Sequence, residues 1–287
     1  MEHSAPNSFA DIYAGAFDTE GFKALVSTVT RPDPLSVMGT EGLSVGESFG
    51  LFFKEFSTSI DKRMAILSKS VHKVDFSAAE NNVRSKKVLF VKCGGIQVLT
   101  PQGFRPGLAN MSAHTQAVTG GVYLISSLKT EATRLYHWLK DIVRTGRMDS
   151  SFKWTVSDFD QAMEEAINYI KNLPTQDRQT RYPLAQVYVS FEEFFENVAS
   201  FNNTVGMIGA RDIQLITREL TNVYDLGNLL VAKIKSNDLV LNEAGIGDIE
   251  SVVNRFVALT NISGVMMALL NELTQVFTEQ SKTVAQL

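Results

Sequence analysis

Cys93 is the side chain in this sequence whose type and setting best suit covalent chemistry. It is the only cysteine, and Gly94 and Gly95 follow it, so a thiolate at this turn would be reachable. A nucleophile also needs a general base and a group that orients the base. The chain has four histidines, none at a recognisable spacing from Cys93: His3, His72, His114 and His137. We therefore expect Cys93 to fill space in the core, because free cysteines are usually buried and inert.

Metal and phosphate sites have sequence patterns that this chain does not contain. Carboxylates recur at helical spacing, but without the Glu-x-x-His motif of di-metal bundles, at Glu164, Glu165, Glu192, Glu193 and Glu196. There is no His-Glu-x-x-His motif and no second cysteine. The glycines within 103–107 lack the lysine and the Ser/Thr of a phosphate-binding loop. The sequence thus predicts a solvated acidic face, no metal, no cofactor and no enzymatic activity.

Basic residues give a stronger pattern. One set lies at spacings of three, four and three, so its members share a helix face: His137, Lys140, Arg144 and Arg147. A second set precedes them at Arg84, Lys86 and Lys87. Phosphate backbones attract such surfaces through counterion release. The helix dipole also favours basic residues near a helix C-terminus without any ligand, so nucleic acid and an acidic protein surface both remain candidate partners.

Charge is segregated along the chain. Net charges of −6 for residues 1–61, +10 for 62–147 and −8 for 148–287 make up the total of −4. Such blocks can pair within one chain, join copies head to tail, or offer the basic block to an acidic partner. The sequence does not choose among these three.

Helical periodicity dominates the organisation of the chain. Apolar residues recur at threes and fours over 47–74, 124–142, 157–173, 191–201 and 213–234. The last helix, expected over about 248–277, keeps a seven-residue period typical of coiled coils. Its expected packing seam consists of Val252, Phe256, Leu259, Met266, Leu270 and Leu273. We expect this seam to pack within the chain or, alternatively, between chains.

Several signals predict where helices begin and end. Ser77 with Glu80 and Ser190 with Glu193 have the spacing of a capping box, in which each side chain binds a free amide at the start of a helix. Gly146 is placed to end the helix over 124–142. Residues 186–189 are expected to be extended.

One region has a β pattern. Residues 88–92 and 96–100 are rich in β-branched side chains and flank Cys93-Gly94-Gly95, which predicts a β-hairpin over about 88–100. A projecting ribbon could pair with another chain through its edges. Prolines, glycines and asparagines in 101–121, including Gly120-Gly121, predict a loop there. The hairpin and this loop together form the expected insertion over 88–121.

Together these patterns predict a mainly α protein, an elongated bundle of long heptad-patterned helices with a small hairpin. We expect an N-terminal arm with one short helix over 1–46 and a helical bundle domain over 47–287. With 44% hydrophobic residues and no apolar run of about 20, the chain should be globular and independent of a membrane. A single cysteine fits synthesis in a reducing compartment such as the cytoplasm.

The expected function is structural. A long arm, heptads and charge blocks suit a non-catalytic assembly protein that acts as a homo-oligomer or within a larger particle, together with other proteins of that assembly. A tailed-phage virion component is the concrete form of this hypothesis, and no motif supports that particular setting. The alternative is a nucleic-acid-associated helical protein that uses the basic block 62–147.

Overall fold

The computed structural model describes residues 71–101, 104–107, 110–148, 151–155, 168, 179–208, 210–239, 241 and 243–287. The predicted arm over 1–46 lies outside these residues. So do most of the predicted helix over 47–74 and all but one residue of that over 157–173.

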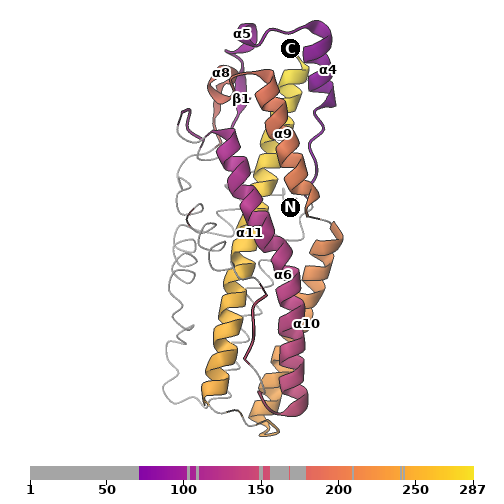
Figure 1. The fold of residues 1–287 in the computed structure, drawn as a ribbon, viewed down its shortest axis with the longest axis vertical. Coiled ribbons are helices and arrows are strands. Elements are labelled where there is room, and N and C mark those ends of the chain that lie inside the picture. Colours follow the sequence, from indigo (N-terminus) through magenta and orange to yellow (C-terminus); the bar gives the residue numbers. More distant parts are fainter. Residues whose placement is uncertain are drawn as a thin grey trace, which may run out of the picture.

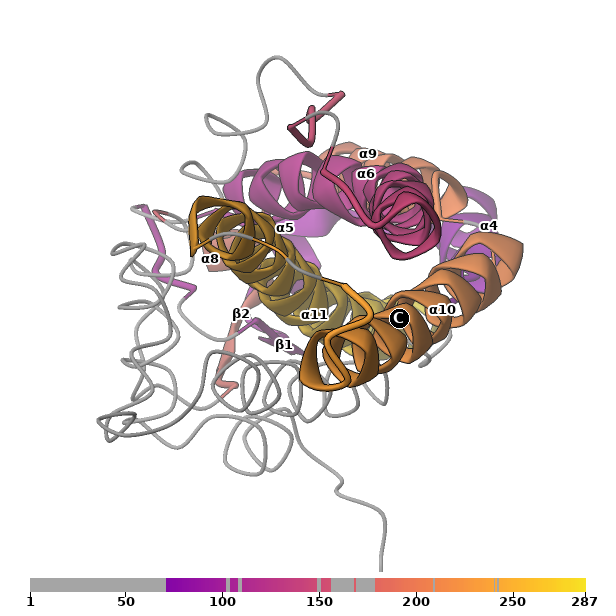
Figure 2. The same cartoon turned by 90° about the horizontal axis from the view of Figure 1, so that it is seen from below.

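Three long helices form what we call the shaft: α6 (Met111–Thr145), α10 (Ala210–Lys235) and α11 (Glu243–Ala285). At about 1.5 Å per residue, the 43 residues of α11 span about 65 Å. Figure 1 shows α6 and α10 descending and α11 returning along the full length of the molecule. Viewed from below, the three helices surround a common axis (Figure 2). The prediction of a mainly helical, elongated protein is confirmed.

The loop predicted over 101–121 is wrong beyond residue 110. Helix α6 begins at Met111, where the side chain of Asn110 accepts a hydrogen bond from the Ala113 amide (2.8 Å). Gly120 and Gly121 lie inside this helix. A Cβ atom at Gly121 would stand 2.3 Å from Met266 Sδ, so this glycine allows a close approach of α6 to α11 rather than a turn. The predicted end is confirmed, with Gly146 in the left-handed conformation (φ 70°).

The hairpin predicted over 88–100 is also wrong. Its first strand is replaced by the short helix α5 (Phe90–Cys93). The second, β1 (Gln97–Leu99), pairs antiparallel with the distant β2 (Arg181–Pro183), so that Val98 faces Tyr182. The Phe90 ring packs edge-on against Phe191 (5.1 Å between centroids), and this contact favours the helical turn over a ribbon.

A further helix, α8 (Leu184–Val187), follows β2 directly and replaces part of the extended segment predicted over 186–189. Its first amides continue the pairing with the β1 side of the sheet. The Leu184 amide donates to the Ile96 carbonyl (2.8 Å) and the Ala185 amide to the Gly94 carbonyl (3.0 Å). A Cβ atom at Gly94 would lie 2.9 Å from that of Ala185, so the two segments meet closely.

Helix α4 (Ser77–Lys86) begins after a segment without regular secondary structure, and the predicted continuation of helix 47–74 over residues 71–74 is wrong. The Asn202 side chain accepts from the Val74 amide (2.8 Å) and donates to the Val74 carbonyl (2.9 Å), which ties this segment to α9 (Phe191–Gly206) instead. Ser77 does not cap α4. It is the first helical residue, and its amide donates to the Asp75 carboxylate, an interaction that lowers the Asp75 pKa.

The second capping box forms largely as predicted at α9 (Phe191–Gly206). The Ser190 hydroxyl accepts from the Glu193 amide (3.1 Å). The Glu193 carboxylate accepts from the amide of Val189 rather than that of Ser190 (2.6 Å). The start of α9 is therefore fixed at both ends of the box.

We call α4, α5, β1, β2 and α8 the apex, because Figure 1 places α4, α5, α8 and β1 at the upper end of the molecule and β2 pairs with β1. A buried polar chain ties the apex to α11. The Tyr188 hydroxyl donates to Gln280 Oε1 and Gln280 Nε2 donates to the Leu99 carbonyl, both at 2.6 Å. Burial raises the Tyr188 pKa, so the hydroxyl keeps its proton.

Candidate interaction surfaces

Cys93 ends α5 and is half-buried against the hydrophobic core. The sequence predicted that Cys93 packs in the core at the turn of a hairpin, whereas the structure places it at the end of a short helix. Phe90 of the same helical turn also packs on that core. The cysteine thus helps to seat α5.

One buried carboxylate in the described part of the chain acts as a structural acceptor. Glu131 of α6 is fully buried and accepts hydrogen bonds from the amide and hydroxyl of Thr155. Next to it, Arg134 donates to the Lys153 carbonyl (2.6 Å), and Arg255 of α11 lies over the Trp154 ring (5.0 Å). Among these residues no group of three or more His, Cys, Asp and Glu side chains is arranged to hold a metal ion.

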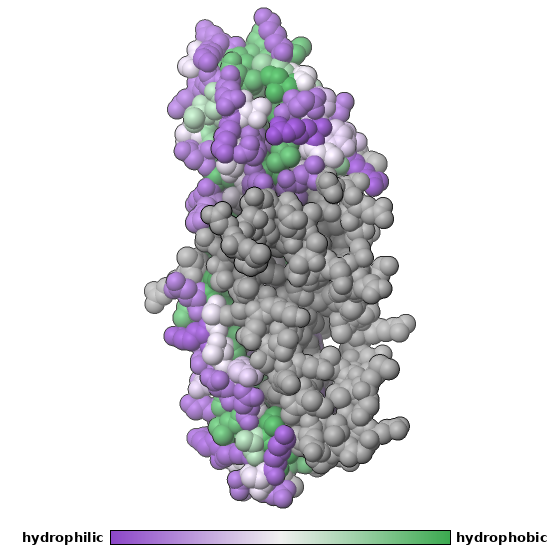
Figure 3. Space-filling model, turned by 180° about the vertical axis from the view of Figure 1, so that it is seen from behind, coloured by the Kyte–Doolittle hydropathy of each residue, from purple (hydrophilic) through white to green (hydrophobic). Residues whose placement is uncertain are grey.

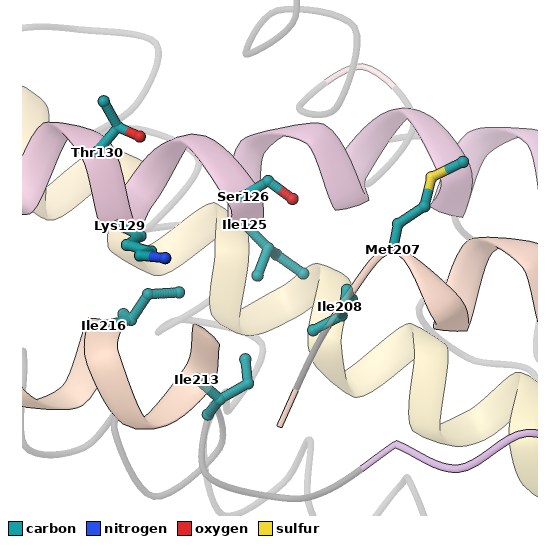
Figure 4. Close-up of a pocket in the computed structure, with 8 residues that line it drawn as sticks. All are labelled: Ile125, Ser126, Lys129, Thr130, Met207, Ile208, Ile213 and Ile216. Atoms are coloured by element: carbon teal, nitrogen blue, oxygen red, sulfur yellow. The ribbon is translucent and has the colours of Figure 1, made fainter. Parts of the chain in front are cut away.

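A small open pocket of about 260 Å³ lies where α9 ends and α10 begins, facing α6. Figure 4 shows its isoleucines, Ile125, Ile208, Ile213 and Ile216, gathered between these elements. Ser126, Lys129, Thr130 and the exposed Met207 complete the lining. Ligand pockets usually measure about 300–1,000 Å³, and we assign no ligand to this one.

The basic residues near the end of α6 lie at the lower end of the shaft. His137, Lys140, Arg144 and Arg147 are all exposed. Arg144 pairs with Asp141 (3.1 Å), and Lys140 lies over the Tyr136 ring (5.5 Å).

Helix α10 passes close to this basic surface. The Glu219 carboxylate of α10 is held mainly by hydrogen bonds from Arg218 and, less strongly, from Asn222. These bonds lower its pKa, and nearby His137 contributes least to that shift. The Lys233 ammonium group binds the Val143 carbonyl (3.0 Å), so α10 also anchors the last turns of α6.

The other predicted basic residues, Arg84, Lys86 and Lys87, lie in and after the last turn of α4, at the opposite end of the molecule. All three are exposed, and Arg84 pairs with Glu80 (2.5 Å). The fold thus places the two predicted sets of basic residues at opposite ends of the molecule. A single partner that touched both would have to follow the whole shaft.

The expected seam residues of α11 are placed along its packed side. Phe256, Leu259, Met266, Leu270 and Leu273 are buried, and Val252 is partly buried against the same core. Helix α11 packs against α6 and, at the apex, against α4.

Three apolar side chains at the apex are exposed, and we call Leu89, Val91 and Val189 the apical patch. Their exposed fractions are 59%, 92% and 83%. Figure 3 shows hydrophobic surface at this upper end, surrounded by hydrophilic residues. Exposed apolar clusters on soluble proteins commonly mark interaction sites.

Sequence reasoning did not identify the apical patch. The β pattern places Leu89 and Val91 on the same face of a predicted strand, and one face of a strand is expected to pack against the rest of the protein. Val189 was assigned to a separate extended segment.

No described helix is both long enough and apolar enough to cross a membrane. No protein-family model matches the chain, and neither the curated proteins nor the solved structures include a significant match to it.

Proposed function

We propose that this chain is a non-catalytic structural protein that assembles with copies of itself within a larger particle. The observation that carries the proposal is the apical patch, which exposes three branched apolar side chains at one end of an elongated helical molecule. Leaving such side chains in water is unfavourable, by about 25 cal/mol per Å² of apolar surface. Contact with another protein removes that cost.

The shaft suits this role because it keeps the two ends of the molecule at a fixed separation. We propose that the seven-residue spacing along α11 reflects heptad packing within one chain, which would make the shaft a stiff strut. The burial of Phe256, Met266 and Leu270 supports this part of the proposal. A tailed-phage virion, in which symmetry repeats one chain many times, is the setting that we propose for it.

The mass of the full chain in solution tests the proposal. We expect sedimentation velocity to reveal species larger than the monomer as protein concentration rises, without added nucleic acid. A chain that stays monomeric at every concentration, in both low and high salt, would overturn the proposal.

The same experiment separates the alternative of nucleic-acid binding through the lower basic surface. Exposed His137, Lys140 and Arg144 on one side of α6 favour this alternative. If only added DNA or RNA produces a larger species, and replacing His137, Lys140, Arg144 and Arg147 with glutamate abolishes it, nucleic-acid association replaces self-assembly as the function.

A further inference from the structure

We infer that the apical patch binds the apical patch of a second copy of this chain about a two-fold axis. The inference rests on the proposed function and names the partner of its interaction surface. It follows from how the fold combines apolar, basic and acidic residues at the apex.

Two segments far apart in sequence are brought together at the patch. The Phe90 ring contacts the Phe191 ring, and the Ala185 amide binds the Gly94 carbonyl. These contacts hold Leu89 and Val91, which flank Phe90, near Val189, which precedes Phe191 by two residues. The patch is therefore a built surface of a folded apex rather than one exposed loop.

Charges of opposite sign accompany the two segments. Lys86, Lys87 and Lys92 surround Leu89 and Val91 in sequence, and all three are exposed. Glu192 and Glu196 follow Val189 on the first turns of α9, on its exposed side. No ion pair within the described chain engages these five residues, whereas Arg84 already has Glu80.

This arrangement is self-complementary. A two-fold contact repeats each pairing, so that the basic segment of one copy meets the acidic segment of the other twice. The exposed apolar side chains belong to the same two segments as these charges and would be removed from water in such a contact. Electrostatic complementarity of this kind fixes the register of a contact more than its strength.

The acidic residues distinguish a second copy from an anionic partner. A lipid surface or a nucleic acid would attract the lysines but would repel Glu192 and Glu196 beside the same patch. A protein surface with both signs of charge satisfies all five residues, and the chain itself presents one.

The contact is expected to be weak in isolation. Stable interfaces bury about 800 Å² on each partner, and three apolar side chains with a charged rim supply only part of that area. Several such contacts within one particle would strengthen one another through effective concentration. We therefore expect reversible dimers whose fraction rises with concentration.

Charge exchange provides the test. One variant of the full chain carries Lys87→Glu and Lys92→Glu, which makes the rim acidic, and the other carries Glu192→Lys and Glu196→Lys, which makes it basic. In sedimentation velocity each variant alone should dissociate at least about tenfold more readily than the parent chain. An equal mixture should dimerise at least as well as the parent, because only unlike rims then meet.

Two controls accompany the mixture. Val91→Asp changes a side chain that is 92% exposed, so the fold should survive while dimerisation is lost. Leu229→Asp places the same change on α10, away from the apex, and should leave dimerisation unaltered. Circular dichroism and thermal melting check that each variant is folded.

The outcomes separate this inference from the proposed function. If the parent self-associates but the two charge variants associate equally well alone, or their mixture does not recover, the apical two-fold contact is wrong and another surface carries assembly. If the parent is monomeric throughout, the proposed function fails first.

Discussion

The shaft and the apex hold their elements together in different ways. In the shaft, each helix carries its own row of apolar side chains, and α6 packs against both α10 and α11. In the apex, short elements are held by contacts with distant parts of the chain, such as the hydrogen bond between Gln280 and Leu99 across 181 residues. The comparison teaches that apolar periodicity within one segment predicts a long packed helix. A surface formed by segments far apart in sequence has no such local pattern.

The largest expected loss of stability comes from a charge placed in the core of the shaft. Leu270→Asp places a carboxylate at a fully buried position of α11, and an unpaired charge there should destabilise the fold by about 4 kcal/mol or more. Chemical denaturation measures the loss. The exposed Gln275 on the same helix supplies the control, because Gln275→Asp should change stability little. Equal stability of the two variants would contradict a buried packing face on α11.

A smaller loss of stability, confined mainly to the apex, is expected when the side chain of Gln280 is replaced. Gln280→Leu leaves the Tyr188 hydroxyl and the Leu99 carbonyl without their partner in a buried setting, at a cost of about 2–4 kcal/mol. Hydrogen exchange should show faster exchange at the Thr100 and Leu184 amides, which belong to the sheet region, than in the middle of α6. Gln275→Leu is the matched control. Uniform loss of protection would mean that apex and shaft unfold as one unit.

Acid should weaken the upper part of α6. Burial lowers the pKa of His114 to about 4, whereas an unfolded histidine titrates near 6.5. The unfolded chain thus binds more protons between these values, so stability should fall as pH decreases from about 6.5 to about 4, by up to about 3 kcal/mol. Below that window both states are protonated and the effect is complete. His114→Gln should reduce this pH dependence, which urea titrations at several pH values measure. If the free energy of unfolding of the variant falls with pH as steeply as that of the parent, His114 is not the cause.

Neighbouring glycines should respond to alanine with opposite signs. At Gly121 a Cβ atom would collide with the buried Met266 side chain, so Gly121→Ala should destabilise the chain by about 1–2 kcal/mol despite its helix propensity. At Gly120 nothing lies within 4 Å, so Gly120→Ala should stabilise it by about 0.5–1 kcal/mol. Thermal melts of the two variants compare them directly. If both changes stabilise the chain, α6 and α11 do not approach closely at this point.

The sequence could predict the shaft because its information is local. The spacing of Leu124, Leu128 and Leu135 predicts one buried face of α6, and the structure buries all three. Ser190 and Glu193 likewise identify the start of α9 within four residues. In each case the interaction that stabilises the element lies within a few turns of the residue that signals it.

The apex escaped prediction because its residues are defined by partners elsewhere. The β-branched run 88–92 has strand character, but the contact of Phe90 with Phe191 selects a helical turn. Gly120 and Gly121 resemble turn residues, yet the closeness of Met266 from α11 explains the second of them. The basic residues were recognised individually, but only the fold divides them between the two ends of the molecule.

The long sequence separation between Leu99 and Gln280 also sets the order in which parts of the molecule fold during synthesis. Gln280 emerges from the ribosome after α4, α5, both strands and α8 have been made, so the sheet region waits for α11 before its polar contacts are complete. Contacts between residues so distant in sequence form late and slowly in folding. A nascent chain therefore has its helices before it has an organised apical surface. If the chain assembles through this surface as proposed, an unfinished chain would lack a completed apex, which would restrain premature docking.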